Sequence, residues 1–332
     1  MPPAIPPPLV SYLESSLASL HGQTLITSVL VTPSPWLLLR FVYAAIYGVG
    51  DDGEARQVGT GPDEVRLGER PVVFVSLLRP LSLWLEMGKK MGLDFQALLR
   101  SKKVVYVDGL ADGSSPAGPG DSSLLSTTRL KALTLNELRY SMNVVLKSSF
   151  RATTETTTSG AGRSSSTPAV PYATASTSSS STGTADAKPL ILLDGIDFLL
   201  ACQPSISTVS LQALLSTLQM QSHALVLTCN ADVPLLQTAM SGSYDDGTPL
   251  ERNHAHFLTS MAHRSRWVFQ LRGLDTGSAK DVSGVIRVSK GGDRGDDESE
   301  ISNLGHTKAL PDAEWLYQLK GDGSVRVWGR GE

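Results

Sequence analysis

The sequence predicts an α/β fold, with a mostly parallel sheet and an antiparallel extension near the end of the chain. Apolar runs such as 72–77 and 190–193 do not alternate with polar residues, which is typical of strands buried on both faces of a parallel sheet. Segments of helical period separate most of these runs, which indicates strand–helix–strand units. In the last third of the chain strands follow one another directly, which indicates antiparallel pairing.

Hydrophobic periodicity places the individual elements. The expected strands are 24–31, 72–77, 103–108, 190–193, 224–228, 267–271, 285–288, 315–319 and 325–328, and the expected helices are 9–20, 36–47, 81–91, 130–146, 208–220 and 250–262. The last two strands flank Gly321-Asp322-Gly323, a sequence typical of a hairpin turn.

Domain organisation follows from length and low-complexity sequence. A chain of 332 residues is long enough for two average domains, but part of this length is not typical of a folded core. More than half of residues 151–187 are Ser or Thr, so we expect a disordered insertion there. After a proline-rich start over 1–8, we therefore expect a single domain over 9–330, interrupted by this insertion and by an acidic, glycine-rich loop over 291–308.

Composition excludes several classes of protein. A hydrophobic content of 41% is enough for a sizeable core, and a net charge of −3 gives no overall attraction to nucleic acid or membrane. The start of the chain lacks the basic and apolar regions of a signal peptide, and Pro33, Pro35 and Arg40 interrupt the most apolar stretch. We expect a soluble intracellular protein in which Cys202 and Cys229 are buried, reduced thiols.

Two predicted strands end where an ATP-binding site would form, but only one of them carries the residues that such a site needs. The strand 190–193 delivers Asp194 to the ligand crevice of the sheet, as a Walker B element does. The strand 24–31 should lead into a phosphate loop, which needs glycines, a lysine and a Ser/Thr for Mg²⁺. It leads instead into Thr32-Pro33-Ser34-Pro35-Trp36. This combination predicts a RecA-like fold without Walker A, in which Asp194 is a structural cap or a remnant rather than a Mg²⁺ ligand.

Other motifs do not predict catalysis or a cofactor. The run Gly48-Val49-Gly50-Asp51-Asp52-Gly53 follows a helix rather than a strand, and it carries acids where pyrophosphate would bind. His254, His256 and His263 share one predicted helix, without a Cys or carboxylate that would complete a metal site. The sequence contains no GxSxG, no HExxH and no paired-carboxylate motif, so we expect no enzyme activity, no nucleotide site and no cofactor.

Basic residues gather in the last third of the chain. Arg264, Arg266, Arg287 and Lys290 are candidates for an RNA-facing patch, because phosphate contacts are made chiefly by Arg and Lys. Acidic residues of the following loop, beginning with Asp293, lie close in sequence and reduce the net positive charge.

Three segments together resemble the Elongator complex protein 6 family, of the filamentous-fungal type. They are the turn 31–36, the strand and its continuation over 189–200, and the segment His263-Arg264-Ser265-Arg266-Trp267-Val268-Phe269-Gln270-Leu271-Arg272 with its continuation to Val288. The resemblance implies a RecA-like fold without Walker motifs and a place in a hetero-hexameric ring of Elongator proteins 4, 5 and 6. It also implies partnership with the catalytic Elongator subcomplex, tRNA binding by the assembled ring, and a cytoplasmic or also nuclear location.

A non-catalytic scaffold that supports modification of the tRNA wobble uridine is the interpretation that joins the residues and the resemblance. RecA-like subunits pack head-to-tail, and ATP fills part of the interface in active members. We expect Pro33, Pro35 and Trp36, with the last hairpin, to contact a neighbouring subunit instead. The alternatives are a divergent ATPase with Asp194 on the metal, and a DNA-binding partner similar to recombinase paralogues.

Overall fold

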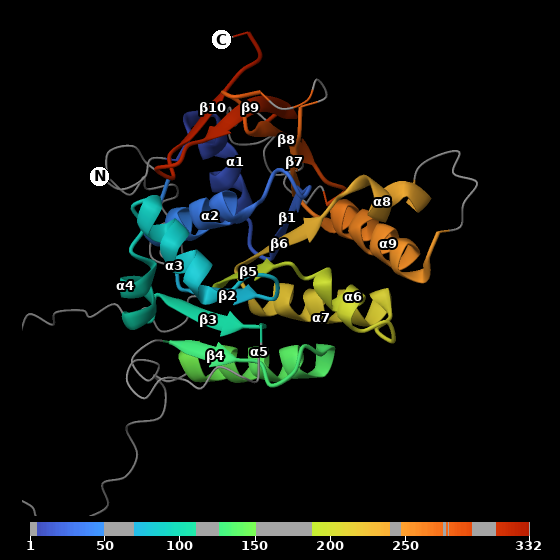
Figure 1. The fold of residues 1–332 in the computed structure, drawn as a ribbon. Coiled ribbons are helices and arrows are strands. Elements are labelled where there is room, and N and C mark those ends of the chain that lie inside the picture. Colours follow the sequence, from blue (N-terminus) through green and yellow to red (C-terminus); the bar gives the residue numbers. More distant parts are fainter. Residues whose placement is uncertain are drawn as a thin grey trace, which may run out of the picture.

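The computed structural model of the chain describes residues 5–49, 70–110, 126–150, 188–239, 247–274, 277, 279–293 and 310–331. The described strands form one sheet with the order β10-β9-β8-β7-β1-β6-β5-β2-β3-β4 (Figure 1). The Ser/Thr-rich insertion 151–187 and most of the loop 291–308 lie outside the described residues. Their disorder, and the assignment of 9–330 to a single domain, therefore stay predictions.

The central part of the sheet is parallel. It consists of β1 (Gly22–Ser28), β2 (Val72–Ser76), β3 (Val104–Asp108), β4 (Thr127–Arg129), β5 (Leu190–Asp194), β6 (Ala224–Asn230) and β7 (Trp267–Arg272). All residues of β2 and β5 are buried, which explains why these strands appear in the sequence as continuous apolar runs. Their register ends with Ser76 opposite Asp194.

An antiparallel extension follows β7. It consists of β8 (Gly284–Lys290), β9 (Ala313–Leu319) and β10 (Val325–Trp328). The turn between β9 and β10 places Gly323 at a φ of 83°, a conformation that favours glycine. The predicted fold class, a mostly parallel sheet flanked by helices with an antiparallel extension near the end of the chain, is confirmed.

Helices cover both faces of the parallel part (Figure 1). On one face lie α1 (Pro7–Ala18), α2 (Pro35–Tyr47), α3 (Leu81–Lys90) and α4 (Phe95–Arg100). On the other face lie α5 (Leu135–Phe150), α6 (Phe198–Cys202), α7 (Thr208–Gln221) and α9 (Pro249–Arg264). The short helix α8 (Val233–Leu236) follows β6 and packs beside α9. No helix in the described ranges is both long enough and apolar enough to span a membrane.

Two hydrophobic cores result, one on each face of the sheet. Side chains alternate along a strand, so neighbouring residues of β2 belong to different cores. Phe74 faces the first core, where its ring lies 4.6 Å from that of Trp84 and 5.7 Å from that of Phe95. Val73 and Val75 face the second core. The parallel strands are therefore fixed from both sides, which positions their carboxyl ends firmly.

The structure differs from the sequence expectations in a few local features. The helices α4, α6 and α8 and the strand β4 were not predicted, and the helix expected from residue 130 begins at Leu135. Its start is set by Thr134, whose Oγ1 accepts the N–H of Glu137 at 3.2 Å. The prediction of two buried thiols is wrong for Cys202, which is exposed because it ends a short helix, whereas Cys229 is buried in β6.

Candidate functional site

Asp194 ends β5 at the carboxyl edge of the sheet, where a Walker B carboxylate is expected. Its side chain is fully buried, and both carboxylate oxygens are engaged by groups of the same chain. Oδ1 forms an ion pair with Nη1 of Arg79 and accepts a hydrogen bond of 3.1 Å from Thr228. Oδ2 lies 3.0 Å from the hydroxyl of Ser76, its register partner on β2. The carboxylate thus has a cationic partner within the protein.

Arg79 reaches Asp194 from the loop between β2 and α3, and this loop is tightly held. The hydroxyl of Ser76 accepts hydrogen bonds of 3.2 Å from the N–H of Arg79 and from Nε1 of Trp84. The carbonyl oxygen of Arg79 accepts a bond of 3.2 Å from the hydroxyl of Tyr106 on β3. Backbone and side-chain contacts therefore fix the guanidinium, which is mostly buried with 18% of its side chain exposed.

The electrostatic balance at this site explains why the cation is needed. Burial raises the pKa of Asp194, because a charged carboxylate loses its hydration inside the protein. The positive charge of Arg79 and the hydrogen bonds from Ser76 and Thr228 act in the opposite direction. A Mg²⁺ ion at this carboxylate would have to displace Arg79. The Asp194 carboxylate is thus neutralised by Arg79 and is not an open metal ligand.

Asp197 has a structural role at the next turn. Its Oδ2 accepts the backbone N–H of Asn230 at 3.1 Å and lies 3.9 Å from Nδ1 of His254. Nε2 of His254 is 2.8 Å from the carbonyl oxygen of Asn230, so this nitrogen carries the proton. These contacts connect the turn after β5 with the end of β6 and with α9. In the described part of the chain, no group of three or more His, Cys, Asp or Glu side chains is arranged to hold a metal ion.

The turn between β1 and α2 replaces the phosphate loop. The N–H of Thr32 donates to the carbonyl of Val29 at 2.9 Å, and Pro35 begins α2, a position that suits proline because it requires no N–H donor. Leu30 and Val31 at the tip of the turn are 84% and 74% exposed. The N–H of Leu30 donates to Oδ1 of Asp232 beyond β6 at 3.1 Å. The turn therefore presents apolar side chains where a P-loop would present backbone N–H groups.

The residues predicted to form a subunit interface separate into two groups. Pro33 is exposed, but Pro35 and Trp36 are buried. The ring of Trp36 packs 5.3 Å from that of Tyr317 on β9, in the first core. The side chain of Trp36 thus joins the turn to the antiparallel extension of its own chain, and it is not available to a neighbouring subunit in this conformation. An interface role stays a prediction for Pro33.

Other exposed apolar side chains follow the carboxyl ends of β2 and β6, the two strands on either side of β5. Leu78, after β2, is 43% exposed, and Val233, after β6, is 61% exposed. Leu78 lies over Gly195, where φ is 71° and where a Cβ on the glycine would come within 2.7 Å of the Leu78 Cβ. We refer to Leu30, Val31, Leu78 and Val233 as the apolar rim. Sequence analysis missed the rim, because its members are far apart along the chain.

The structure does not bring the four predicted RNA-facing residues onto one surface. Nη2 of Arg264 donates to Oγ of Ser216 at 2.6 Å, and Nη1 of Arg266 donates to Oγ of Ser19 at 3.2 Å. Arg287 and Lys290 are both exposed, but they lie three residues apart on β8 and so face opposite sides of the sheet. An RNA role stays a prediction for each of them separately.

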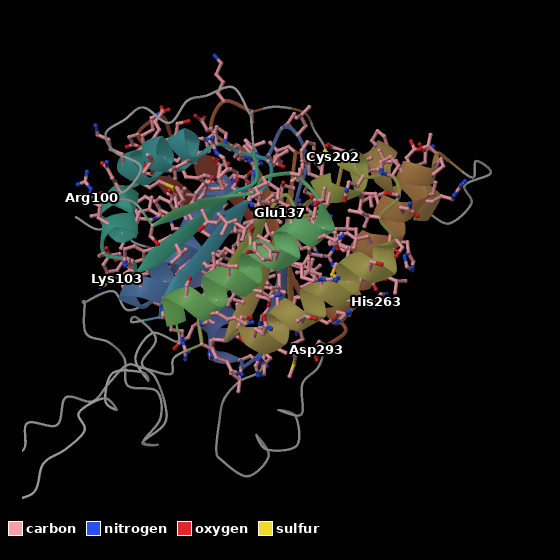
Figure 2. The ribbon with its side chains drawn as sticks, turned by 90° about the horizontal axis from the view of Figure 1, so that it is seen from below. Arg100, Lys103, Glu137, Cys202, His263 and Asp293 are labelled. Atoms are coloured by element: carbon pink, nitrogen blue, oxygen red, sulfur yellow. The ribbon has the colours of Figure 1, made fainter. Side chains whose placement is uncertain are left out.

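The start of the acidic loop lies beside two of these basic residues. The N–H of Gly291 donates to the carbonyl of Arg266 at 2.9 Å, and the N–H of Asp293 approaches the carbonyl of Ser265 at 3.4 Å. Figure 2 shows Asp293 and His263 near one another, away from Arg100 and Lys103. The acidic loop therefore leaves the sheet next to the end of α9.

A family model and solved structures are similar to this chain. A search of curated proteins finds no match. Among solved structures, a KaiC-like protein of the hyperthermophilic archaeon Pyrococcus horikoshii is similar, with 16% identity, a TM-score of 0.45, and coverage of 93% of this chain and 90% of that chain. The family model described as Elongation complex protein 6 matches residues 67–309, well over half of the sequence. The chain therefore belongs to the Elongation complex protein 6 family.

Proposed function

We propose that this chain is a non-catalytic structural subunit of Elongator. In this proposal it forms a hetero-hexameric ring with Elongator proteins 4 and 5, and the ring binds tRNA and supports modification of the wobble uridine by the catalytic Elongator subcomplex. The ring acts in the cytoplasm and also in the nucleus. Membership of the Elongation complex protein 6 family supports a place in Elongator, and the remaining statements go beyond it.

The ion pair of the buried Asp194 with Arg79 is the observation that supports the non-catalytic part of the proposal. An ATPase needs a strand-end carboxylate that can orient Mg²⁺ and a loop of backbone N–H groups for phosphate. Here the carboxylate pairs with Arg79, and the loop between β1 and α2 contains Pro33 and Pro35. The chain itself therefore occupies both the position of the metal ion, with Arg79, and the position of the phosphate loop, with Pro33 and Pro35.

Calorimetry of the isolated full chain with Mg²⁺–ATP tests this part. We expect no heat of binding at the concentrations used for active RecA-like ATPases. Binding that weakens when Asp194 is replaced by Asn would support the divergent ATPase instead and would refute the non-catalytic assignment.

The apolar rim supports the assembly part of the proposal. Exposed apolar residues that gather at one site commonly mark a protein interface, whereas single ones are ordinary. In this proposal the occupant of the rim is the adjacent Elongator subunit of the ring. Leu30 and Val31 project furthest, and they should contribute most to this contact.

Native mass spectrometry of the complex reconstituted with Elongator proteins 4 and 5 tests the rim. The double variant Leu30→Asp/Val31→Asp should lose the hexamer, because two charges would enter an apolar contact. The matched control Val209→Asp/Met220→Asp changes residues of α7 that are 67% and 62% exposed, and it should keep the hexamer. An intact hexamer in the rim variant would show that the interface lies elsewhere.

A further inference from the structure

The antiparallel extension has a second face that belongs to neither hydrophobic core. Along β8, β9 and β10, one set of side chains faces the first core, including Ile286, Tyr317 and Val327. The alternate set faces the other way. There the strand register aligns Val285, Leu316 and Trp328 in one row, and none of the three belongs to either core. Val285 is fully buried, whereas Leu316 and Trp328 are half-buried.

Arginines flank this apolar row on both sides. Arg326 precedes Trp328 by two residues on β10. Arg330 lies beyond the end of β10, and its ion pair with Glu314 holds it beside the same face. Arg287 of β8 lies in the same row as Glu314 of β9. The face thus combines apolar side chains with a clear excess of positive charge.

The acidic side chain on this face does not neutralise it. Glu314 forms ion pairs with Arg272 at 3.0 Å and with Arg330 at 2.8 Å. Within the described ranges, neither Arg287 nor Arg326 forms an ion pair with a carboxylate. The guanidinium of Arg326 instead lies 5.3 Å from the centre of the Trp328 ring. Two arginines therefore remain without an acidic partner beside the apolar row.

The backbone of β10 offers a second binding feature. β10 is the last strand of the sheet on this side, so one of its edges has no neighbouring strand in the described part of the chain (Figure 1). A free edge can accept an additional strand through main-chain hydrogen bonds, while alternate side chains of that strand supply specificity.

We infer that β10 and this second face bind an extended acidic segment of a partner protein, which adds to the sheet as a further strand. Its side chains facing Arg326 and Trp328 would be acidic and apolar, two positions apart. A second acid would reach Arg330, whose side chain is 59% exposed although it also contacts Glu314. Arginine guanidinium groups bind carboxylates with two parallel hydrogen bonds, which favours Asp or Glu at the outer positions.

A protein segment fits this face better than a single-stranded nucleic acid. Base binding needs an open aromatic ring for stacking. The guanidinium of Arg326 lies over one face of the Trp328 ring, the side chain of Trp328 is half-buried, and its neighbours in the row are the aliphatic Leu316 and Val285. The apolar row and the free strand edge are both features that a polypeptide can use.

Fluorescence anisotropy with the isolated full chain tests the inference, and it does not require ring assembly. The probe is a labelled peptide Thr-Glu-Thr-Leu-Thr-Glu-Thr, and the control peptide has Lys in place of both Glu. We expect the Glu peptide to bind and the Lys peptide not to bind. In the variant Arg326→Glu/Arg330→Glu, affinity for the Glu peptide should fall at least tenfold, and the Lys peptide should now bind.

A matched variant, Arg100→Glu/Lys103→Glu, changes the net charge equally between α4 and β3, and it should bind the Glu peptide as the wild type does. The gain of Lys-peptide binding also shows that the Arg326→Glu/Arg330→Glu variant is folded. Three results would each overturn the inference: no binding of the Glu peptide, equal loss in the matched variant, or binding of oligo-uridylate that depends on Arg326 and Arg330 while the peptide does not bind.

Discussion

Replacement of Arg79 by methionine removes the cation that contacts the buried Asp194 carboxylate. The loss of one member of a buried ion pair costs about 3–5 kcal/mol, because the remaining charge stays without compensation. Arg79 is 18% exposed and water can approach the vacated position, so we expect the lower value, about 3 kcal/mol. With a urea m-value of about 3 kcal/mol per M, the unfolding midpoint should fall by about 1 M.

The pH dependence of this loss identifies its cause. Without Arg79, the pKa of Asp194 should rise further above its usual range, since burial already raises it. The folded variant then holds a proton more tightly than the unfolded chain, so its stability is highest below about pH 4 and decreases as the pH rises through the raised pKa. The difference in stability from the wild type should therefore be larger at pH 8 than at pH 5.

Two controls make this prediction specific. Arg129→Met removes the exposed ion pair with Asp108, whose atoms are 3.7 Å apart, and should cost less than about 1 kcal/mol. Asp194→Asn in the Arg79→Met background removes the uncompensated charge and should restore part of the stability. The claim that Arg79 compensates the buried charge of Asp194 is refuted by either of two results. One is that Arg79→Met lowers the free energy of unfolding no more than Arg129→Met does, and the other is that its effect is the same at both pH values.

Three further predictions can be checked by denaturant unfolding. Trp36→Ala should destabilise the isolated chain by about 3–5 kcal/mol, because a fully buried ring that packs on Tyr317 is lost; an unchanged midpoint would contradict its place in the core. Gly291→Ala should also destabilise the chain, since a Cβ would meet the carbonyl oxygen of Ser265 at 1.8 Å, whereas Gly321→Ala, with no atom within 4 Å, should be tolerated. Burial lowers the pKa of His223 to about 4, so the stability that its neutral form provides is present above about pH 6.5 and is lost as the pH falls towards 4. The wild type should lose about 2 kcal/mol more between pH 7 and pH 5 than His223→Gln does, and equal losses would argue against a buried neutral imidazole.

Much of the fold could be predicted because its strands are buried on both faces. A run such as 190–193 must be apolar throughout, and that pattern is visible without any partner strand. The helix α4 has six residues and β4 has three, which is too short for a periodic pattern to be distinguished from an irregular segment. The start of α5 was placed too early, although Thr134 caps the N–H of Glu137 and is a local signal for the first turn. The N–H of Leu135 also donates to the side chain of Gln203, a contact that only the tertiary structure reveals.

The sequence predicted the position of Asp194 at the edge of the sheet, but not the side chains that contact it. Asp194 ends a strand in the sequence, and the structure places it at the expected edge of the sheet. Its partner Arg79 lies 115 residues earlier, and no local pattern indicates that the two side chains meet. For the same reason the sequence could not show that Trp36 contacts Tyr317, from the other end of the chain.

The sequence by itself determined the class of the fold, the strand that carries Asp194 and the absence of a phosphate loop between β1 and α2. These properties depend on residue type and on spacing over a few residues, which are visible in the chain alone. Only the tertiary structure decided that Arg79 neutralises Asp194, that Trp36 is part of the core, and that Arg326 lies over Trp328 on the second face of the antiparallel extension. Each of these depends on strand order and register, which bring together residues that are distant in sequence.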